Sequence, residues 1–146
     1  MNLKPIGYVR RASKQENVKD RTLSSQIVIR REFACALDGL EDFSHLFVVF
    51  YMHEVRREDA RELKVHPRGR LDLPLVGVFA TRSAFRPNPI GLTVVELLER
   101  RGSVLFVRGL DAFDGTPVLD LKPVDDRDMV SGLRVPQWLR TLHAGK

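Results

Sequence analysis

Residues 90–107 read IGLTVVELLERRGSVLFV, and this stretch decides the fold class. Two short apolar segments, 90–98 and 104–107, flank a polar run that contains Gly102. A glycine in such a run suits the bulged turn of a β-hairpin. The stretch therefore predicts two antiparallel strands.

The apolar segments on either side of this hairpin are equally short and are broken by Gly, Pro and Asp. This pattern is typical of all-β proteins. We expect further strands at 3–9, 26–29, 46–52, 75–80 and 118–121, with 46–52 and 75–80 buried on both faces. Short helices are expected at 32–37 and 136–142. About seven strands at hairpin spacing predict a mainly β protein, a single-sheeted antiparallel β-barrel with one or two short helices.

Composition limits the class of protein. The chain has 146 residues, of which 43% are hydrophobic and 29% charged, as expected for one folded domain spanning 1–146. No apolar run approaches the roughly 20 residues that cross a bilayer, and no signal peptide is expected. The lone cysteine, Cys35, excludes an internal disulfide and a cysteine-rich zinc site, and we expect it to fill the core. These features predict a cytoplasmic protein with no membrane contact.

The charge is positive and consists mostly of arginine. Lys and Arg number 24 against 19 Asp and Glu, giving +5, and several arginines occur in pairs. Guanidinium groups bind phosphate in a bidentate way, so nucleic acid is a plausible partner, the alternative being an ordinary solvated surface. The charged stretch 56–70 is long for a connection, which makes it a candidate functional loop.

Two further stretches carry candidate chemistry. In GVFATRSAFRPNPIG (77–91), two prolines restrict the backbone around Arg86 and Asn88, as expected for a preorganised site or for a structural turn. In GLDAFDGTPVLDLKP (109–123), Asp111 and Asp120 lie at ends of apolar segments, and Asp114 lies in a turn. Turn capping or a salt bridge is the alternative role for these carboxylates.

Other motifs are missing from the sequence. His45 and His53 would lie about 25 Å apart along one strand, so no metal site is expected. The chain contains neither the glycine fingerprint of dinucleotide-binding folds nor a phosphate-binding P-loop.

The motifs FATRS (79–83), RPNPIG (86–91), DGTPV (114–118) and DLKP (120–123) together resemble the TsaA-like or TrmO family. The characterised members of this family are S-adenosylmethionine-dependent methyltransferases that act on N6 of threonylcarbamoyladenosine at tRNA position 37. The resemblance covers a core of about 6–123 and leaves 124–146 as a C-terminal tail. It implies a β-barrel, a methyl donor bound outside any Rossmann fold, and a homodimer with its active site near the subunit interface. The sequence departs from the family pattern at Arg11, Glu54 and Val124, where Ser, Gln and Tyr are common.

The resemblance also implies site residues. The expected donor-binding residues are His53, Glu54, Arg82, Leu92, Arg108, Gly109, Leu110 and Asp111. An arginine such as Arg82, expected at the end of a buried strand, would bind the donor's carboxylate, and Glu54 or Asp111 its ribose hydroxyls or amino group.

For catalysis we expect Asn88 to accept the N–H bonds of the adenine amine, by analogy with other N6-adenine methyltransferases. Asp111 and Asp114 are the candidate proton acceptors. The expected RNA contacts are Arg56, Arg57, Arg68, Arg70 and Arg86.

Two alternative functions are open from the sequence. The same scaffold could methylate another RNA, a nucleotide or a small molecule. Alternatively, the barrel could bind nucleic acid without catalysis, which would require aromatic residues alternating along one exposed strand face. The aromatic residues here lie mainly in apolar runs, which disfavours this second alternative.

Overall fold

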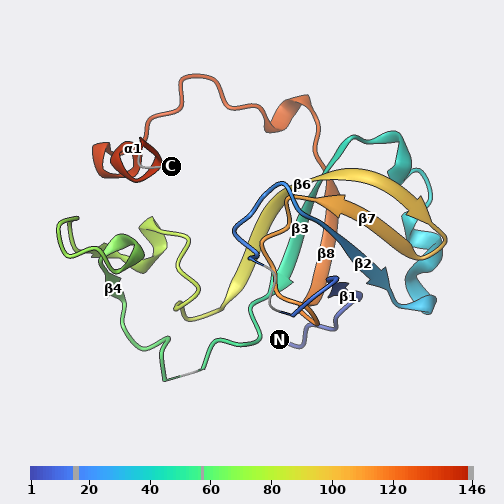
Figure 1. The fold of residues 1–146 in the computed structure, drawn as a ribbon, viewed down its shortest axis with the longest axis horizontal. Coiled ribbons are helices and arrows are strands. Elements are labelled where there is room, and N and C mark those ends of the chain that lie inside the picture. Colours follow the sequence, from blue (N-terminus) through green and yellow to red (C-terminus); the bar gives the residue numbers. More distant parts are fainter. Residues whose placement is uncertain (15–16, 57, 145–146) are drawn as a thin grey trace.

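The computed structural model describes residues 1–14, 17–56 and 58–144 and shows a closed β-barrel (Figure 1). Six strands follow one another around the barrel in the order β1-β2-β7-β6-β3-β8, and every neighbouring pair is antiparallel. The barrel strands are β1 (Gly7–Arg10), β2 (Ser24–Ile29), β3 (His45–Tyr51), β6 (Ile90–Arg101), β7 (Val104–Arg108) and β8 (Pro117–Pro123). The predicted antiparallel barrel is confirmed.

The remaining elements are short. A separate two-stranded sheet pairs β4 (Lys64–Val65) with β5 (Val76–Gly77). Five 3-10 helices and one α-helix complete the described chain: η1 (Arg31–Leu37), η2 (Leu40–Asp42), η3 (Pro67–Gly69), η4 (Val78–Ala80), η5 (Asp126–Asp128) and α1 (Gln137–Ala144). In Figure 1 the segment 52–89, coloured green to yellow, and α1 lie to one side of the barrel. We call the segment 52–89 the excursion.

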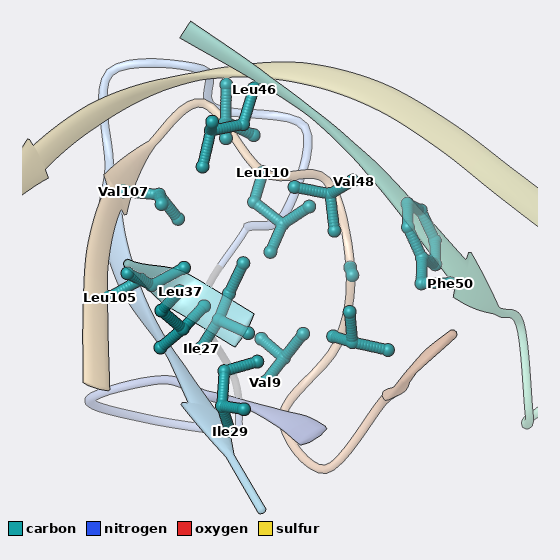
Figure 2. Close-up of a cluster of buried hydrophobic side chains, with 13 residues drawn as sticks. Val9, Ile27, Ile29, Leu37, Leu46, Val48, Phe50, Leu105, Val107 and Leu110 are labelled. Atoms are coloured by element: carbon teal, nitrogen blue, oxygen red, sulfur yellow. The ribbon is translucent and has the colours of Figure 1, made fainter. Parts of the chain in front are cut away.

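Strand alternation forms the core. Along β6, Gly91, Thr93 and Val95 point inward, whereas Leu92 and Val94 are exposed. The same period of two on the other strands directs one side chain in two into the barrel. Figure 2 shows the resulting cluster, which includes Val9, Ile27, Leu46, Val48, Phe50, Leu105, Val107 and Leu110. Each fully buried aliphatic side chain contributes about 1.5–3 kcal/mol to folding.

The antiparallel register places particular strand ends together. The last residues of β1, β3 and β7 lie at the same end of the barrel as the first residues of β2, β6 and β8. We call this the loop end, because the connections 11–23 and 109–116 and the excursion all begin or finish there. At the opposite end η1 lies between β2 and β3, and its Leu37 is buried in the core (Figure 2).

Arg100 forms several hydrogen bonds at this opposite end of the barrel. Its Nη1 donates to the Leu37 carbonyl oxygen at 2.9 Å and to Glu41 Oε2 at 3.1 Å, and its Nη2 donates to Asp38 Oδ1 at 2.9 Å. The hairpin turn between β6 and β7 follows directly, with Gly102 at φ 59° as the sequence predicts. One arginine therefore ties η1 and η2 to the β6–β7 hairpin.

Several predicted elements were wrong. Residues 75–80 do not form one buried strand but contribute β5 and η4 outside the barrel, with Phe79 74% exposed; the six strands of the barrel roughly match the number predicted. The strand predicted at 3–9 begins only at Gly7, whereas the short helix predicted at 32–37 is confirmed as the 3-10 helix η1. β3 alternates instead of being buried on both faces, because a barrel has one interior. Cys35 is exposed and does not fill the core.

Candidate functional site

The connection between β7 and β8, residues 109–116, forms part of the loop end. Leu110 and Ala112 are 1% and 2% exposed and pack into the core, whereas Asp111 and Phe113 between them are exposed. This alternation continues the strand pattern beyond β7. It follows that Asp111 presents its carboxylate on the outside of the loop.

Arg11 braces this connection from the end of β1. Its Nη1 donates to the carbonyl oxygens of Leu110 and Ala112, at 3.0 and 3.2 Å, and its backbone N–H donates to Asp114 Oδ1 at 2.9 Å. Gly109, at φ 89°, donates its N–H to the Leu23 carbonyl at 3.1 Å. A loop held by several directional bonds keeps its side chains in fixed positions, as a binding site requires.

Asp111 is itself fixed by two side chains. The Thr93 hydroxyl of β6, which is 5% exposed, donates to Asp111 Oδ1, and Arg21 Nη1 lies 3.8 Å from Oδ2. Arg21 also donates from Nη2 to the Val94 carbonyl at 2.9 Å. A hydrogen bond to a charged group is worth about 1.5–3 kcal/mol. The side chain of Asp111 remains 41% exposed and is therefore oriented yet accessible to a ligand.

Two further residues expected to bind the methyl donor lie on β6 and β7, the strands that this connection adjoins. Leu92, 51% exposed, precedes Thr93 on β6, and Arg108 ends β7 opposite Glu96 of β6. Arg108 Nη1 donates to Glu96 Oε2 at 2.8 Å. The side chain of Leu110 is buried in the core and offers a ligand only its backbone. The structure thus brings together Leu92 and residues 108–111.

His53 and Asp114 lie at the same end of the barrel. His53 follows β3, and its Nδ1 lies 3.4 Å from the Thr116 hydroxyl oxygen. Glu54 is exposed in the turn that follows. Asp114 is half-buried and accepts the Arg11 N–H, which is the turn-capping role that its sequence context left open.

Arg82, Arg86 and Asn88 lie in the excursion. Arg82 is exposed after η4, so the expectation that it ends a buried strand was wrong. Arg86 is half-buried: its Nη1 donates to the Thr81 carbonyl at 3.2 Å, and its guanidinium lies 5.9 Å from the centre of the Phe79 ring. Asn88 is exposed, and its backbone carbonyl oxygen accepts a hydrogen bond from the Ile90 backbone N–H at 2.7 Å.

The basic residues of the excursion are accessible. Arg56, Arg68 and Arg70 are exposed, and Arg57 lies outside the described residues. Arg70 forms a two-bond pair with Asp72, at 3.1 and 2.5 Å, and this hydrogen bonding raises the pKa of Arg70. Arg68 adopts φ 54°, a left-handed conformation that non-glycine residues rarely take.

Two grooves mark the surface elsewhere on the barrel. One, of about 360 Å³, is lined by Tyr8, Arg10, Val28, Ile29, Arg30 and Gly115. The other, of about 550 Å³, is lined by Phe47, Lys122, Pro123, Asp125, Arg127 and Asp128. Neither of these two grooves is lined by an expected donor-binding residue.

Two further kinds of feature are absent from the described residues. Across residues 1–14, 17–56 and 58–144, no three His, Cys, Asp or Glu residues gather in a way that could hold a metal ion. In the same ranges, no helix has the length and apolar character needed to cross a membrane.

The side chains at the loop end suit a methyl donor of the S-adenosylmethionine type. The open side of the Asp111 carboxylate is an acceptor for hydroxyl or ammonium groups, and exposed Leu92 offers an apolar contact for a purine ring. Outside the loop end, Arg82 of the excursion has an exposed side chain whose guanidinium could bind a carboxylate. The residues present therefore fit the group that the sequence resemblance implies.

The fold and the site together define a small β-barrel protein whose candidate ligand site is built from end loops and strand β6 rather than from a Rossmann unit. Residues 10–128 match the family model described as the tRNA-methyltransferase O N-terminal domain. The chain belongs to this family, TrmO, as its sequence motifs indicate.

Individual relatives support this membership. A probable S-adenosyl-L-methionine-binding protein of Methanothermobacter thermautotrophicus is 44% identical over 128 residues, which cover 84% of this chain and 89% of that protein. The mouse tRNA (adenine(37)-N6)-methyltransferase is 44% identical over 101 residues, covering 68% of this chain and 23% of the mouse protein.

Solved structures agree with the fold. The crystal structure of TrmO from P. aeruginosa matches with a TM-score of 0.74 and 31% identity, over 94% of this chain and 61% of that one. Another TrmO crystal structure gives a TM-score of 0.71 and 34% identity, covering 92% of this chain and 62% of the other. The chain thus spans about three fifths of the length of these solved proteins.

Proposed function

We propose that this protein is an S-adenosyl-L-methionine-dependent methyltransferase that methylates N6 of threonylcarbamoyladenosine at position 37 of tRNA. The observation that carries the proposal is the extent of the family match. It spans residues 10–128 and so includes every candidate donor, catalytic and RNA-binding residue. A tRNA substrate would place the protein in the cytoplasm.

In this proposal the donor supplies an electrophilic methyl group, and the chain's own residues position the reactants. Asp111, held by Thr93 and Arg21, binds hydroxyl or ammonium groups of the donor on its open side. Arg82 is free to bind a carboxylate, since within the described ranges it makes no hydrogen bond or ion pair.

Proton removal from the adenine amine requires an accessible acceptor. Asp114 Oδ1 already accepts the Arg11 N–H, whereas Asp111 keeps an exposed side. Asp111 and Asp114 are the two proposed proton acceptors, and Asp111 is the more exposed of the two. Asn88, exposed just before β6, is the proposed acceptor for the N–H bonds of the amine, which would raise its nucleophilicity.

A homodimer with the active site near its interface is also part of the proposal. Tyr51 of β3 and Ile90, Leu92 and Val94 of β6 share the outward face beside the site and are 39–51% exposed. An apolar face of this kind favours association, and a second copy covering it would enclose the open donor residues. Sedimentation should therefore show twice 16.7 kDa at micromolar concentration, and Val94→Asp should shift the protein toward monomer.

The exposed arginines of the excursion are the proposed phosphate contacts. Replacing Arg56, Arg68 and Arg70 by Ser should weaken tRNA binding and flatten its salt dependence, without changing donor affinity. Unchanged tRNA affinity and salt slope would instead favour a small-molecule acceptor on the same scaffold.

The decisive experiment is methyl transfer to tRNA. Purified protein, labelled S-adenosylmethionine and tRNA from a strain that lacks the modification should yield a methylated nucleoside, identified by mass spectrometry. Asp111→Asn should abolish the transfer, whereas Asp120→Asn is the matched control, because Asp120 is similarly exposed on β8 and pairs with Lys122 at 2.9 Å. Wild-type protein that binds the donor but leaves tRNA unmodified would contradict the proposed substrate.

Donor binding can be tested separately by calorimetry. Arg82→Ala should weaken donor affinity about 10- to 150-fold, the value of one charge-assisted hydrogen bond, and should affect tRNA affinity less. A folded Arg82→Ala variant with unchanged donor affinity would remove Arg82 from the site.

A further inference from the structure

A second surface lies on the outward face of β1 and β2. Tyr8 points outward from β1 opposite Val28 of β2 and is 40% exposed, and Arg10 follows on the same face opposite Gln26. The groove of about 360 Å³ is lined by Tyr8, Arg10 and Val28, together with Arg30, which follows β2. An aromatic side chain therefore stands in an open groove between two arginines.

The groove keeps a net positive charge. Arg30 Nη2 pairs with Glu32 Oε1 at 2.6 Å, and its Nη1 lies 3.4 Å from the Pro5 carbonyl oxygen. Arg10 makes no ion pair with any residue in the described ranges. Because one guanidinium is balanced by a carboxylate and the other is not, the surface favours an anionic partner.

The same face continues onto β7 with a similar arrangement. Phe106 of β7 lies opposite Gln26 of β2, and the Arg101 guanidinium lies 4.9 Å from the centre of its ring. Arg101 in turn pairs with Glu99 at 2.7 Å. Two aromatic rings with neighbouring arginines thus share one outward surface of the sheet, the arrangement by which proteins bind single-stranded nucleic acid.

We propose that this groove binds a single-stranded segment of RNA, with one base stacked on the Tyr8 ring and adjacent phosphates contacted by Arg10 and Arg30. Gly115 also lines the groove, and it belongs to the connection 109–116 that contains Asp111. An RNA strand bound here therefore reaches the loop end of the barrel. The inference rests on the proposed function and deepens it, because it assigns a path for the substrate across the barrel wall in addition to the phosphate contacts of the excursion.

The test is fluorescence anisotropy with a labelled single-stranded RNA oligonucleotide, which requires no methylation. Tyr8→Ala should weaken binding about 5- to 150-fold, equivalent to about 1–3 kcal/mol for one stacked base. Tyr8→Phe keeps the ring and should bind within about twofold of wild type. The double variant Arg10→Ser with Arg30→Ser should lower the salt slope by about one unit per lost phosphate contact.

Arg134→Ser, at an exposed arginine between η5 and α1, is the matched control and should leave the affinity and slope unchanged. Thermal melting checks that each variant folds. If Tyr8→Ala does not fold, the RNA affinity and salt slope of the Arg10→Ser, Arg30→Ser double variant decide whether the groove binds RNA. Equal RNA affinity in Tyr8→Ala and wild type, or an equal loss in Arg134→Ser, would overturn the inference. If the wild-type protein bound no donor or methylated no tRNA, this would count against the proposed function alone. The oligonucleotide measurement requires neither donor binding nor methylation and therefore tests the further inference separately.

Discussion

Gly91 offers a sharp test of how the barrel is packed beside the site. It lies on β6 opposite Phe50 of β3, and a Cβ added there would be 2.3 Å from two Phe50 ring carbons and 2.8 Å from a third. Phe50 is 4% exposed and packs within the core (Figure 2). The Gly91→Ala variant must therefore displace this ring within a closely packed interior.

The size of the effect follows from that distance. The ring must move by about 1 Å to restore an ordinary contact of 3.4 Å, and overpacking of this kind costs about 1–3 kcal/mol. For a chain near 150 residues, each kcal/mol lowers the melting temperature by about 2–4 °C. We therefore expect Gly91→Ala to melt about 2–12 °C below wild type.

Differential scanning calorimetry and urea unfolding both measure this effect. Gly77→Ala is the matched control, because a Cβ at Gly77 meets no atom within 4 Å and the backbone there, at φ −61°, accepts any residue. That variant should be neutral or slightly stabilised. Phe50→Leu in the Gly91→Ala background should recover part of the loss, as a positive coupling in a double-mutant cycle. A Gly91→Ala protein that melts with wild type would refute this account of the β3–β6 packing.

Three further changes test the frame of the barrel. Gly7→Ala should destabilise the protein at least as strongly as Gly91→Ala, because the added Cβ would lie 2.5 Å from the Val28 carbonyl oxygen, which is backbone; urea unfolding measures it. Leu105→Ala should lose about 2–5 kcal/mol of unfolding free energy by opening a cavity, since Leu105 is fully buried. The pKa of Glu41 in the folded protein is lowered below its ordinary value of 4.5, first by the hydrogen bond from its own backbone N–H and then by Arg100. The ionised Glu41 therefore stabilises the folded protein fully above pH 4.5, and this contribution is lost as the pH falls through the lowered pKa of the folded state. Arg100→Met should weaken that acid dependence, and identical pH profiles for variant and wild type would contradict this.

Local patterns in the sequence were sufficient to predict much of the barrel. The hairpin β6–β7 was predicted because alternation and a turn glycine are local signals. The prediction of one buried strand at 75–80 was wrong because an apolar run does not indicate which other part of the chain packs against it. Val78 is 1% exposed, but its neighbour Phe79 is 74% exposed. Whether residues 75–80 form a barrel strand depends on whether another barrel strand can pair with them, and that is decided by the fold of the whole chain.

The contacts that hold the candidate site together could not be predicted from the sequence, for a related reason. The family motifs led to Asp111, but the side chains that hold it come from elsewhere in the chain: Thr93 from the interior of β6 and Arg21 from the connection before β2. Arg11 braces a carbonyl 99 positions further along the chain. Such contacts arise only when the barrel closes, and no local signal in the sequence marked them.

The division between barrel and excursion has a functional consequence. Asp111 and Arg108 lie on or beside strands, held by hydrogen bonds to β6, whereas Arg56, Arg68 and Arg70 lie on the excursion that stands off from the barrel (Figure 1). A rigid carboxylate suits recognition of a small donor, because its affinity depends on fixed geometry. Arginines on long connections suit a phosphate backbone, because charge attraction tolerates displacement. Donor binding should therefore respond to substitutions in β6, in the connection 109–116 and at Arg82. RNA binding should respond to substitutions at Arg56, Arg68 and Arg70 and in the groove of β1 and β2, so that the two can be lost independently in one folded protein.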